Sequence, residues 1–371
     1  MSTIGWDIGG AHLKLARSDG GRLVEVRQIP CPLWLGLDRL HASIQEGLAD
    51  WPAPSAHAVT MTGELTDLFP DRDHGVRALV EAVEARAGGA KIAIYASDGT
   101  FLDASGAKAD PARVASANWH ASARLVATQI SDGLFVDVGS TTTDLVPLRG
   151  GAVAARGTDD AARLATGELI YRGIVRTPVM AVVQHVLVGG VRTGVMAEYF
   201  STMADVYRLT GELPSHADLH PSADGRSKSP ADSRARLARM IGRDAGSAPD
   251  ETWDGLARQI ANQQLDDIAE GAMRIAAVAG LSSDAPIVGA GVGRFLAAAL
   301  ARRLRRPYQG FEIIVAAADG PLSSLAADCA PAAAVALLLD PPSSRDRKRT
   351  TADGSSSPAR PPVASAERKP R

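Results

Sequence analysis

The sequence predicts an α/β protein of two domains with a cleft between them, and two similar segments are the main reason. Residues 3–16 (TIGWDIGGAHLKLA) and 133–148 (GLFVDVGSTTTDLVPL) each join two apolar runs through a turn that begins Asp-x-Gly. This pattern is typical of two strands connected by a tight turn, and its repetition indicates a duplicated architecture. Residues 286–295 (PIVGAGVGRF) add a short strand, a glycine-rich turn and a helix start. We place the first domain at residues 1–128 and the second at 129–340, since 371 residues suit two domains.

The first turn has the composition of a phosphate-binding loop. Gly9 and Gly10 let a ligand approach the backbone, where N–H groups bind phosphate oxygens, and we assign His12 to the same loop. Lys14 follows the turn and is our candidate for a catalytic cation. Asp7 ends the first strand, and its oxygens suit a hydrated Mg²⁺ ion. One such turn also occurs in ordinary hairpins, so the argument depends on the second copy.

The second turn repeats this composition with more hydroxyl groups. Asp137 ends one strand and Asp144 begins the next apolar run, and we assign both to the same metal site. The residues between them offer backbone N–H and side-chain O–H donors to phosphate. These phosphate-binding candidates are Gly139, Ser140, Thr141, Thr142 and Thr143.

The third turn supplies Gly289, Gly291 and Gly293, which we also assign to phosphate binding. A Rossmann interpretation of this motif would require it near the start of a domain, with an acidic residue about 20 residues later. Here the motif comes late, and the next candidate, Glu312, falls on an expected strand.

Between the first two turns the chain alternates between strand and helix patterns. We expect strands at residues 22–29, 56–62 and 91–95 and helices at 37–49, 76–87 and 113–128. The strand at 56–62 is followed by Glu64 and Asp67, at the end of a strand where α/β folds place their chemistry. They are our candidates for a catalytic carboxylate. The alternative is that Thr62 or Thr66 only caps the next helix.

Beyond the second turn, Arg172 and Arg176 are spaced to bind substrate carboxylates, although both could be solvated surface charges. Residues 216–229 form a polar loop that is too long for a simple connector and is a candidate lid. We expect helices at residues 199–210, 232–241, 252–281 and 330–339, and a further helix that follows the glycine turn and ends at residue 304. We expect a strand at 312–316.

Composition narrows the function classes. A net charge of −2 argues against general nucleic-acid binding. Cys31 and Cys329 have no metal-site or disulfide spacing, and an iron–sulfur cluster of the dehydratase-activator kind would need paired cysteines. No signal peptide or long apolar run is evident, so we expect a cytoplasmic protein acting on small molecules, without membrane or nucleic-acid partners. A homo-oligomer is compatible with this sequence. Residues 341–371 lack large apolar side chains and are expected to be disordered.

The three turns in this order resemble the actin-like, sugar-kinase and heat-shock-ATPase superfamily, which implies an actin-like (ribonuclease H-like) fold with an interdomain cleft. Within it, the chain resembles the hydantoinase/oxoprolinase-related branch linked to the tetrahydromethanopterin one-carbon pathway. The similar segments run from residue 4 to about residue 295 and include DIGGAHLKLA, TMTGELTD, VASANWHASA, GELIYRGIVRTPV and VGAGVGRFL. The family's first turn usually reads DIGGANTK, and this chain departs from it at His12 and Leu13.

The resemblance implies an enzyme of methanofuran or methylofuran biosynthesis. Such enzymes join an (aminomethyl)furanmethyl diphosphate to the phenol oxygen of (γ-glutamyl)tyramine and release diphosphate. The implied site has Mg²⁺, a carboxylate base at Glu64 or Asp67, and Arg172 and Arg176 for the glutamyl carboxylates. ATP could bind this fold, but we expect it not to be required. Two other classes stay open: an ATP-dependent kinase or hydantoinase/oxoprolinase-like hydrolase, and a nucleotide-driven switch or filament protein.

Overall fold

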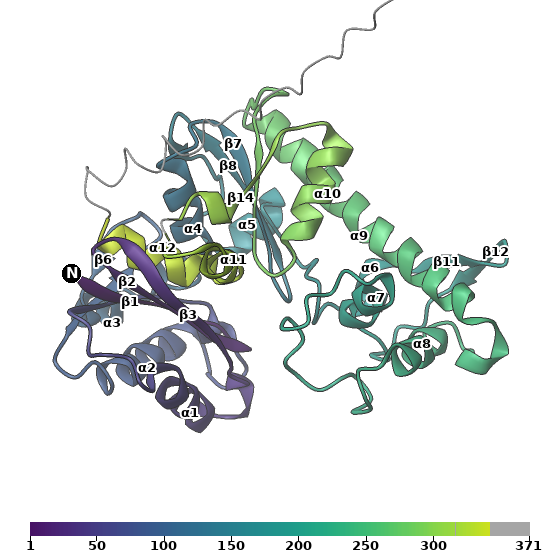
Figure 1. The fold of residues 1–371 in the computed structure, drawn as a ribbon, viewed down its shortest axis with the longest axis horizontal. Helices are drawn as coiled ribbons and strands as arrows, with labels where there is room; N and C mark the ends of the chain where they lie inside the picture. The colour runs from purple at the N-terminus through teal and green to yellow at the C-terminus, as the bar shows by residue number, and fades with distance from the viewer. Residues whose placement is uncertain (316, 342–371) are drawn as a thin grey trace, which may run out of the picture.

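A computed structural model describes residues 1–315 and 317–341, so the expected tail lies outside the described residues except for residue 341. The first domain is built on a six-stranded sheet, coloured purple to blue in Figure 1, in the order β3-β2-β1-β4-β5-β6. Its first two strands are antiparallel, whereas β4 and β5 run parallel to β1. The strands are β1 (Ser2–Ile8), β2 (His12–Asp19), β3 (Arg22–Pro30), β4 (Ala56–Met61), β5 (Lys91–Tyr95) and β6 (Phe101–Leu102).

Short helices follow these strands and cover the sheet. They are η1 (Leu33–Leu35), α1 (Leu37–Leu48), η2 (Gly63–Leu65), α2 (Arg72–Glu84), α3 (Ala104–Ala109), η3 (Pro111–Arg113) and α4 (Asn118–Ala127). The side chain of Asp71 caps α2 by accepting a hydrogen bond from the His74 N–H at 2.9 Å. Neither Thr62 nor Thr66 therefore caps this helix, and the capping alternative for that segment is wrong.

The second sheet repeats the strand order of the first. Its order is β10-β8-β7-β13-β14, with β9 paired to β8. As in the first sheet, an antiparallel pair (β7, β8) is extended by two parallel strands (β13, β14). The strands are β7 (Gly133–Val138), β8 (Thr143–Arg149), β9 (Ala152–Val153), β10 (Leu169–Ile170), β13 (Ile287–Ala290) and β14 (Tyr308–Gly310). The sequence duplication is thus a duplication of the sheet.

A helical region is inserted between β10 and β13 and projects from the second sheet (Figure 1). Its longest helix, α9, runs from the sheet into this region, where it packs on α7, α8 and a two-stranded hairpin. The elements of the second domain outside the sheet are α5 (Asp160–Thr166), α6 (Val179–Val182), β11 (His185–Val188), β12 (Val191–Gly194), α7 (Met203–Thr210), α8 (Pro230–Arg239), η4 (Ala245–Ser247), α9 (Asp250–Val278) and α10 (Arg294–Leu304).

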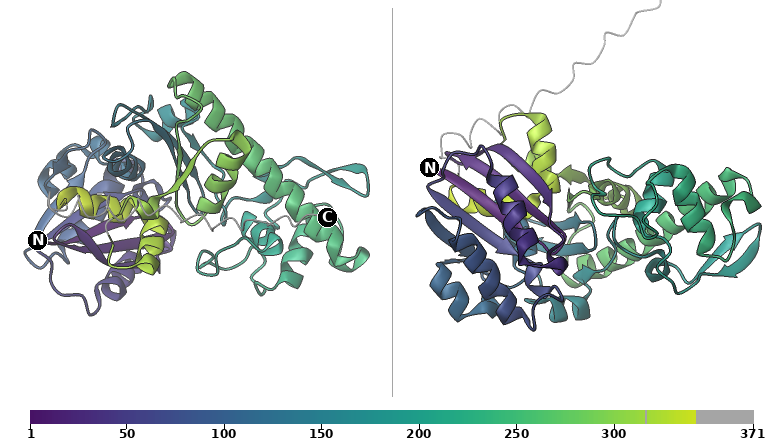
Figure 2. Two further views of the ribbon diagram at one scale, coloured as in Figure 1. Left: turned by 45° about the horizontal axis from the view of Figure 1, so that its top comes forward. Right: turned by 90° about the horizontal axis from the view of Figure 1, so that it is seen from below.

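The end of the described chain returns to the first domain. After η5 (Phe311–Ile313), helices α11 (Gly320–Asp328) and α12 (Ala330–Leu339) lie against the strands of the first sheet, as both views of Figure 2 show in yellow. The alanine-rich α12 is almost wholly buried, and its core also contains side chains of α4 and of both sheets. This shared apolar core joins the two domains.

The expected strand at residues 312–316 is wrong over its described part, because Phe311–Ile313 forms a 3-10 helix. Phe311 is fully buried, with its ring centroid 6.3 Å from that of Phe135, so core packing turns the chain after β14. A short apolar run cannot distinguish the two structures by periodicity. The expected helix at 113–128 begins only at Asn118, and the hairpin of β11 and β12 was not anticipated.

No single helix of the described ranges is long and apolar enough to cross a membrane. Only α11 and α12 together reach that length and composition, and they are bent by 106° at their junction.

Candidate active site

The first turn holds a buried ion pair. Asp7 and Lys14 lie opposite each other on β1 and β2, and the Lys14 Nζ is 3.5 Å from the Asp7 Oδ2. The other carboxylate oxygen of Asp7 is buried and has no hydrogen-bond partner among the described residues. Burial raises the pKa of Asp7, and Lys14 opposes this shift. Burial lowers the pKa of Lys14, but the charges of Asp7 and its acidic neighbours outweigh that effect, so the pKa is raised.

The second turn places two more carboxyl groups beside this pair. Asp137 and Asp144 face each other on β7 and β8. Burial and the neighbouring charges of Asp144 and Asp7 raise the pKa of Asp137 to about 7, although Lys14 opposes the shift. Asp144 is held by the buried Arg163 at 2.9 Å. The two turns therefore meet at one site between the domains, with more acidic groups than nearby cations.

The glycine turn closes on the end of β7. Gly291 has a φ of +81°, and a Cβ there would lie 2.4 Å from the Asp137 Oδ1. The Gly293 N–H donates to the Val138 carbonyl at 2.8 Å. Gly289, Gly291 and Gly293 are all buried, so close packing accounts for these glycines. Their proposed contact with phosphate stays a prediction.

The hydroxyl groups of the second turn differ in their availability. The Thr143 side chain is fully buried and donates to the Arg172 carbonyl at 2.8 Å, a contact that links the strands. The Ser140 Oγ is buried and has no hydrogen-bond partner in the part of the chain that the structure describes. Gly139, Thr141 and Thr142 are half-buried, as are Gly9 and Gly10 of the first turn. Ser140, Thr141 and Thr142 are therefore the better donors for a ligand.

Glu64 is the carboxylate next to the first turn. Its neighbour Gly63 packs closely on the end of β1, since a Cβ there would lie 3.1 Å from the Ile8 carbonyl oxygen. Glu64 is 1% exposed, its Oε1 lies 2.8 Å from the Ser116 Oγ, and its Oε2 has no hydrogen-bond partner among the described residues. Burial raises the pKa of Glu64. Asp67, by contrast, is exposed and makes no side-chain hydrogen bond or ion pair within residues 1–315 and 317–341.

The two candidate arginines have different surroundings. Arg172 is paired with Asp267 at 2.7 Å. The guanidinium of Arg176 lies over the ring of Trp34, with its carbon 5.0 Å from the centroid. His220 packs on the same ring and on His12, with centroid separations of 5.4 and 5.0 Å. Residues from both domains thus form one cluster beside the first turn. Of the two candidate arginines, Arg176 is the one without a carboxylate partner among the described residues.

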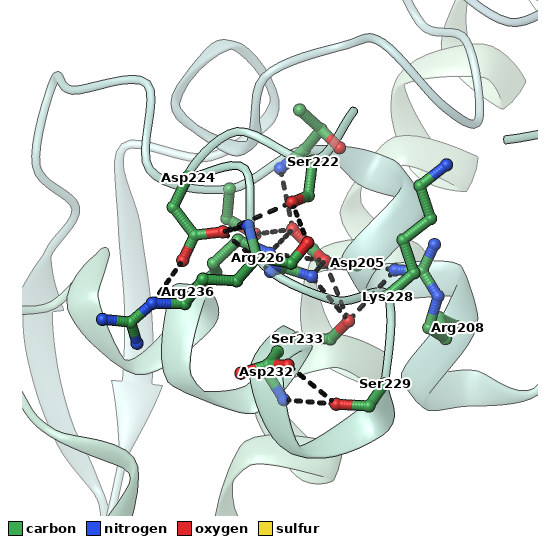
Figure 3. Close-up of polar contacts among 12 residues, drawn as sticks. Asp205, Arg208, Ser222, Asp224, Arg226, Lys228, Ser229, Asp232, Ser233 and Arg236 are labelled. Atoms are coloured by element: carbon green, nitrogen blue, oxygen red, sulfur yellow. Dashed lines mark hydrogen bonds and ion pairs between the residues drawn. The ribbon is translucent and has the colours of Figure 1, made fainter. Parts of the chain in front are cut away.

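The polar loop expected at residues 216–229 spans the two domains. His220 Nε2 donates to the Ala11 carbonyl at 3.0 Å, and His216 Nε2 lies 2.8 Å from Asp328 of α11. A charged network, drawn in Figure 3, holds the base of the loop. At its centre the fully buried Arg236 pairs with Asp205 at 2.7 Å and with Asp224 at 3.0 Å.

Several site residues were missed by the sequence analysis. They are Trp34, Ser116, Asp160, Arg163, His220 and Asp328, which all contact predicted residues or their partners. Ser116 carried a local signal, since it lies in the VASANWHASA segment, and His220 lies in the polar loop expected at residues 216–229. The others have partners far away in the sequence, which no local pattern reveals.

Two sheets of equal strand order, with an Asp-x-Gly turn from each meeting between them, define an actin-like ATPase fold. The sequence model of the hydantoinase/oxoprolinase family matches residues 55–334, well over half of the chain. The chain therefore belongs to the hydantoinase/oxoprolinase family.

Among characterised relatives, a protein of Methanocaldococcus jannaschii is 30% identical over 276 residues, covering 74% of this chain and 81% of the relative. It is named (4-{4-[2-(gamma-L-glutamylamino)ethyl]phenoxymethyl}furan-2-yl)methanamine synthase. A protein of Methanococcus vannielii with the same name is 34% identical over 107 residues, covering 29% of this chain and 46% of the relative. Among solved structures, a ROK family glucokinase from Streptomyces griseus aligns with a TM-score of 0.46 and 16% identity, over 91% of this chain and 99% of that one. The fold assignment rests on the strand order and not on this likeness.

Proposed function

We propose that this protein is a transferase that joins an (aminomethyl)furanmethyl diphosphate to the phenol oxygen of (γ-glutamyl)tyramine and releases diphosphate. The observation that carries the proposal is the match to the M. jannaschii synthase over most of both chains. The product in that relative's name contains a phenoxymethyl-furan ether, which is the bond that this reaction forms. The charged side chains at the domain junction also support the proposal, because they suit a reaction that releases diphosphate.

The leaving diphosphate accumulates negative charge as the carbon–oxygen bond breaks. Lys14 offsets that charge from the first turn, and the hydroxyl and N–H groups around Ser140, Thr141 and Thr142 donate hydrogen bonds to the phosphate oxygens. Because these donors belong to turns held by strands, they need little reorganisation during the reaction.

Mg²⁺ fits the carboxyl groups at the junction. Asp7 has a buried oxygen without a hydrogen-bond partner among the described residues, and Asp137 has a raised pKa because it is buried and has acidic neighbours. A divalent cation beside Asp7 and Asp137 would remove this excess of negative charge. Asp144 is less available, because Arg163 already occupies its carboxylate. No group of three potential ligands has metal-site spacing in the described residues, so waters and substrate oxygens would complete the coordination. When bound, the ion supplies further charge neutralisation for diphosphate.

Glu64 is the base that accepts the phenol proton. A phenol has a pKa near 10 and is a weak nucleophile until its proton leaves. The buried Glu64 has a raised pKa and a free oxygen, both of which suit a proton acceptor. Asp67 is exposed to solvent, so of our two candidates we favour the buried Glu64.

Arg176 binds a carboxylate of the glutamyl group. Its guanidinium lies over Trp34 and has no acidic partner in the described part of the chain, whereas Arg172 is already paired with Asp267. The exposed Trp34 ring beside it offers an apolar surface for the tyramine ring.

The test is ether formation by nucleotide-free protein. Purified protein is incubated with the furanmethyl diphosphate, γ-glutamyltyramine and Mg²⁺, with and without ATP, while diphosphate release and product mass are followed. We expect product and diphosphate in equal amounts without ATP, because the substrate carries its own leaving group. An absolute requirement for ATP, with ADP formed in step with product, would reject this reaction in favour of a kinase-like or hydrolase-like one.

A further inference from the structure

The strongest unassigned feature is a chain of polar side chains that leads from Glu64 across the domain junction. The Ser116 Oγ lies 2.8 Å from the Glu64 Oε1 and 3.0 Å from the Asp160 Oδ2. Asp160 begins α5 of the second domain and is paired with Arg72 at 2.6 Å. The exposed fraction rises along this series of polar side chains. Glu64 is 1% exposed, whereas the Asp160 and Arg72 side chains are 15% and 35% exposed.

The backbone at Ser116 supports a special role for this residue. Ser116 has a φ of +50° and is one of three non-glycine residues with positive φ among the described residues. Such a conformation is strained for a residue with a side chain and persists where the surrounding structure enforces it. Here it places a buried hydroxyl between two carboxyl groups that come from different domains.

Counting hydrogens indicates which group carries a proton. A hydroxyl has one hydrogen to donate, and two ionised carboxylates can only accept. If both short contacts of Ser116 are hydrogen bonds, one carboxyl group must donate to the Ser116 Oγ. That group is Glu64, because Asp160 is paired with Arg72 and Glu64 is buried away from water.

We propose that Ser116 and Asp160 form a proton relay that connects Glu64 to solvent. The inference rests on the proposed function, in which Glu64 accepts the phenol proton. The phenol oxygen bonds to the furanmethyl carbon while the carbon–oxygen bond to diphosphate breaks, and its electron pair leaves with diphosphate. The phenol proton goes to the Glu64 Oε2, the Oε1 proton to the Ser116 Oγ, and the Ser116 hydroxyl proton to the Asp160 Oδ2. Asp160 then releases a proton to water.

The relay predicts a specific dependence of kcat on pH. With the relay intact, Glu64 can accept a proton on one oxygen as it gives one up from the other. Without it, Glu64 can act only after it has ionised, so kcat should rise with pH. The titratable and charged groups that face Glu64 and Asp160 are Arg72, Asp144 and Tyr171.

The experiment compares Ser116→Ala and Asp160→Asn with the wild type in kcat, KM and melting temperature between pH 6 and 9.5. We expect kcat to fall about 10- to 100-fold at pH 7, which reaches the lower end of the roughly 10²–10⁴-fold contribution of general acid–base catalysis, with KM changed less than about threefold. The loss should shrink with rising pH, to within about threefold of wild type at pH 9.5. Ser116→Gly, which suits the positive φ, should give the same profile if the alanine variant folds poorly.

Matched controls lie next to both residues. Ser122→Ala removes a buried hydroxyl from α4, and Asp159→Asn changes the residue before Asp160 while keeping a helix cap. Both should keep the wild-type profile. A relay variant with wild-type kcat, or one whose loss is the same at every pH, would reject the relay. Glu64→Gln separates the two ideas: near-normal activity of this variant would reject Glu64 as the base, whereas an inactive Glu64→Gln with unaffected Ser116→Ala would reject the relay alone.

Discussion

At the domain junction, buried acidic residues outnumber the basic residues that could neutralise them. Asp7, Asp137 and Asp144 come within interacting distance of one another, and Lys14 and Arg163 are their nearby cations. Buried carboxylates without sufficient partners destabilise a protein, and natural proteins retain such groups mainly at functional sites. The raised pKa of Asp137 is thus an argument for a bound cation or a cationic substrate group at this position.

Asp7→Asn and Asp137→Asn should each lower kcat about 10²–10³-fold, the usual effect of removing one preorganised charge contact. Because each change keeps the shape of the side chain and leaves Lys14 with an acidic neighbour, the fold should stay intact. Asp132→Asn, at an exposed position just before β7, is the matched control. Turnover is measured at saturating and at limiting Mg²⁺. Near-normal turnover of either variant at limiting Mg²⁺ would mean that its carboxylate does not orient the metal.

His12 should make the protein sensitive to acid. Burial and the charges of Lys14, His220 and Arg176 lower its pKa to about 3. The unfolded chain therefore binds a proton at His12 near pH 6.5 while the folded chain does not, so folding loses up to about 1.4 kcal/mol per pH unit below 6.5. His12→Asn, the residue usual in this family, should flatten the fall in melting temperature between pH 6.5 and 4. An unchanged slope would show that His12 is not the group responsible.

At the scale of elements, the loop at residues 216–229 is anchored to the second domain and also contacts the first domain. The network of Figure 3 ties the loop to α7 and α8, while His220 contacts the first turn and His216 contacts α11. The loop therefore connects three parts of the chain that surround the site. Whether it opens as a lid stays a prediction, but its contacts with Ala11 and Trp34 lie at the edge of the proposed acceptor site.

Arg236→Met should destabilise the protein by about 3–5 kcal/mol. The change leaves Asp205, which is 2% exposed, without its main cationic partner, and unpaired buried charges have costs of this size. The control is Arg239→Met on the same helix, where the side chain is 42% exposed and 4.0 Å from Asp224, so the loss should be below about 1 kcal/mol. Urea unfolding measures both. Equal stability of the two variants would mean that the network of Figure 3 does not stabilise the fold.

At the scale of the whole molecule, α12 packs the end of the described chain against the first strands of the protein. It packs across β1, β2 and β4, and its core includes apolar side chains from both sheets. Alanine-rich helices allow such close approach: a Cβ at Gly5 of β1 would lie 2.0 Å from the Ala332 carbonyl oxygen. The first domain therefore needs residues near both ends of the chain.

Gly5→Ala should separate β1 from α12 and lower the free energy of unfolding by about 1–3 kcal/mol or more, the usual range for overpacking. Gly246→Ala is the control, since a Cβ there meets no atom within 4 Å. Thermal and urea unfolding of both variants test this. A Gly5→Ala protein as stable as the control would show that α12 does not pack closely on the first sheet.

The sequence by itself determined the elements with strong local patterns. The two Asp-x-Gly turns, the strand at Lys91–Tyr95 and the helix at Ala330–Leu339 were predictable because alternating or continuous apolar runs and glycine turns depend on neighbouring residues. The duplication also predicted two similar sheets, and the structure confirms the actin-like fold. The order of the turns indicated the superfamily, and the similar segments indicated the family, before any contact was known.

Only the tertiary structure decided which side chains share a site and how they are charged. Glu64 and Asp67 are equivalent in the sequence, but folding buries the first beside Ser116 and leaves the second exposed. Arg172 and Arg176 have the same charge, yet one pairs with Asp267 and the other lies over Trp34. These differences come from partners up to about 140 residues away along the chain, and burial and pairing set the pKa and the availability of each group. The physical reason is that a local pattern specifies backbone conformation, whereas desolvation and ion pairing exist only after distant segments have packed together.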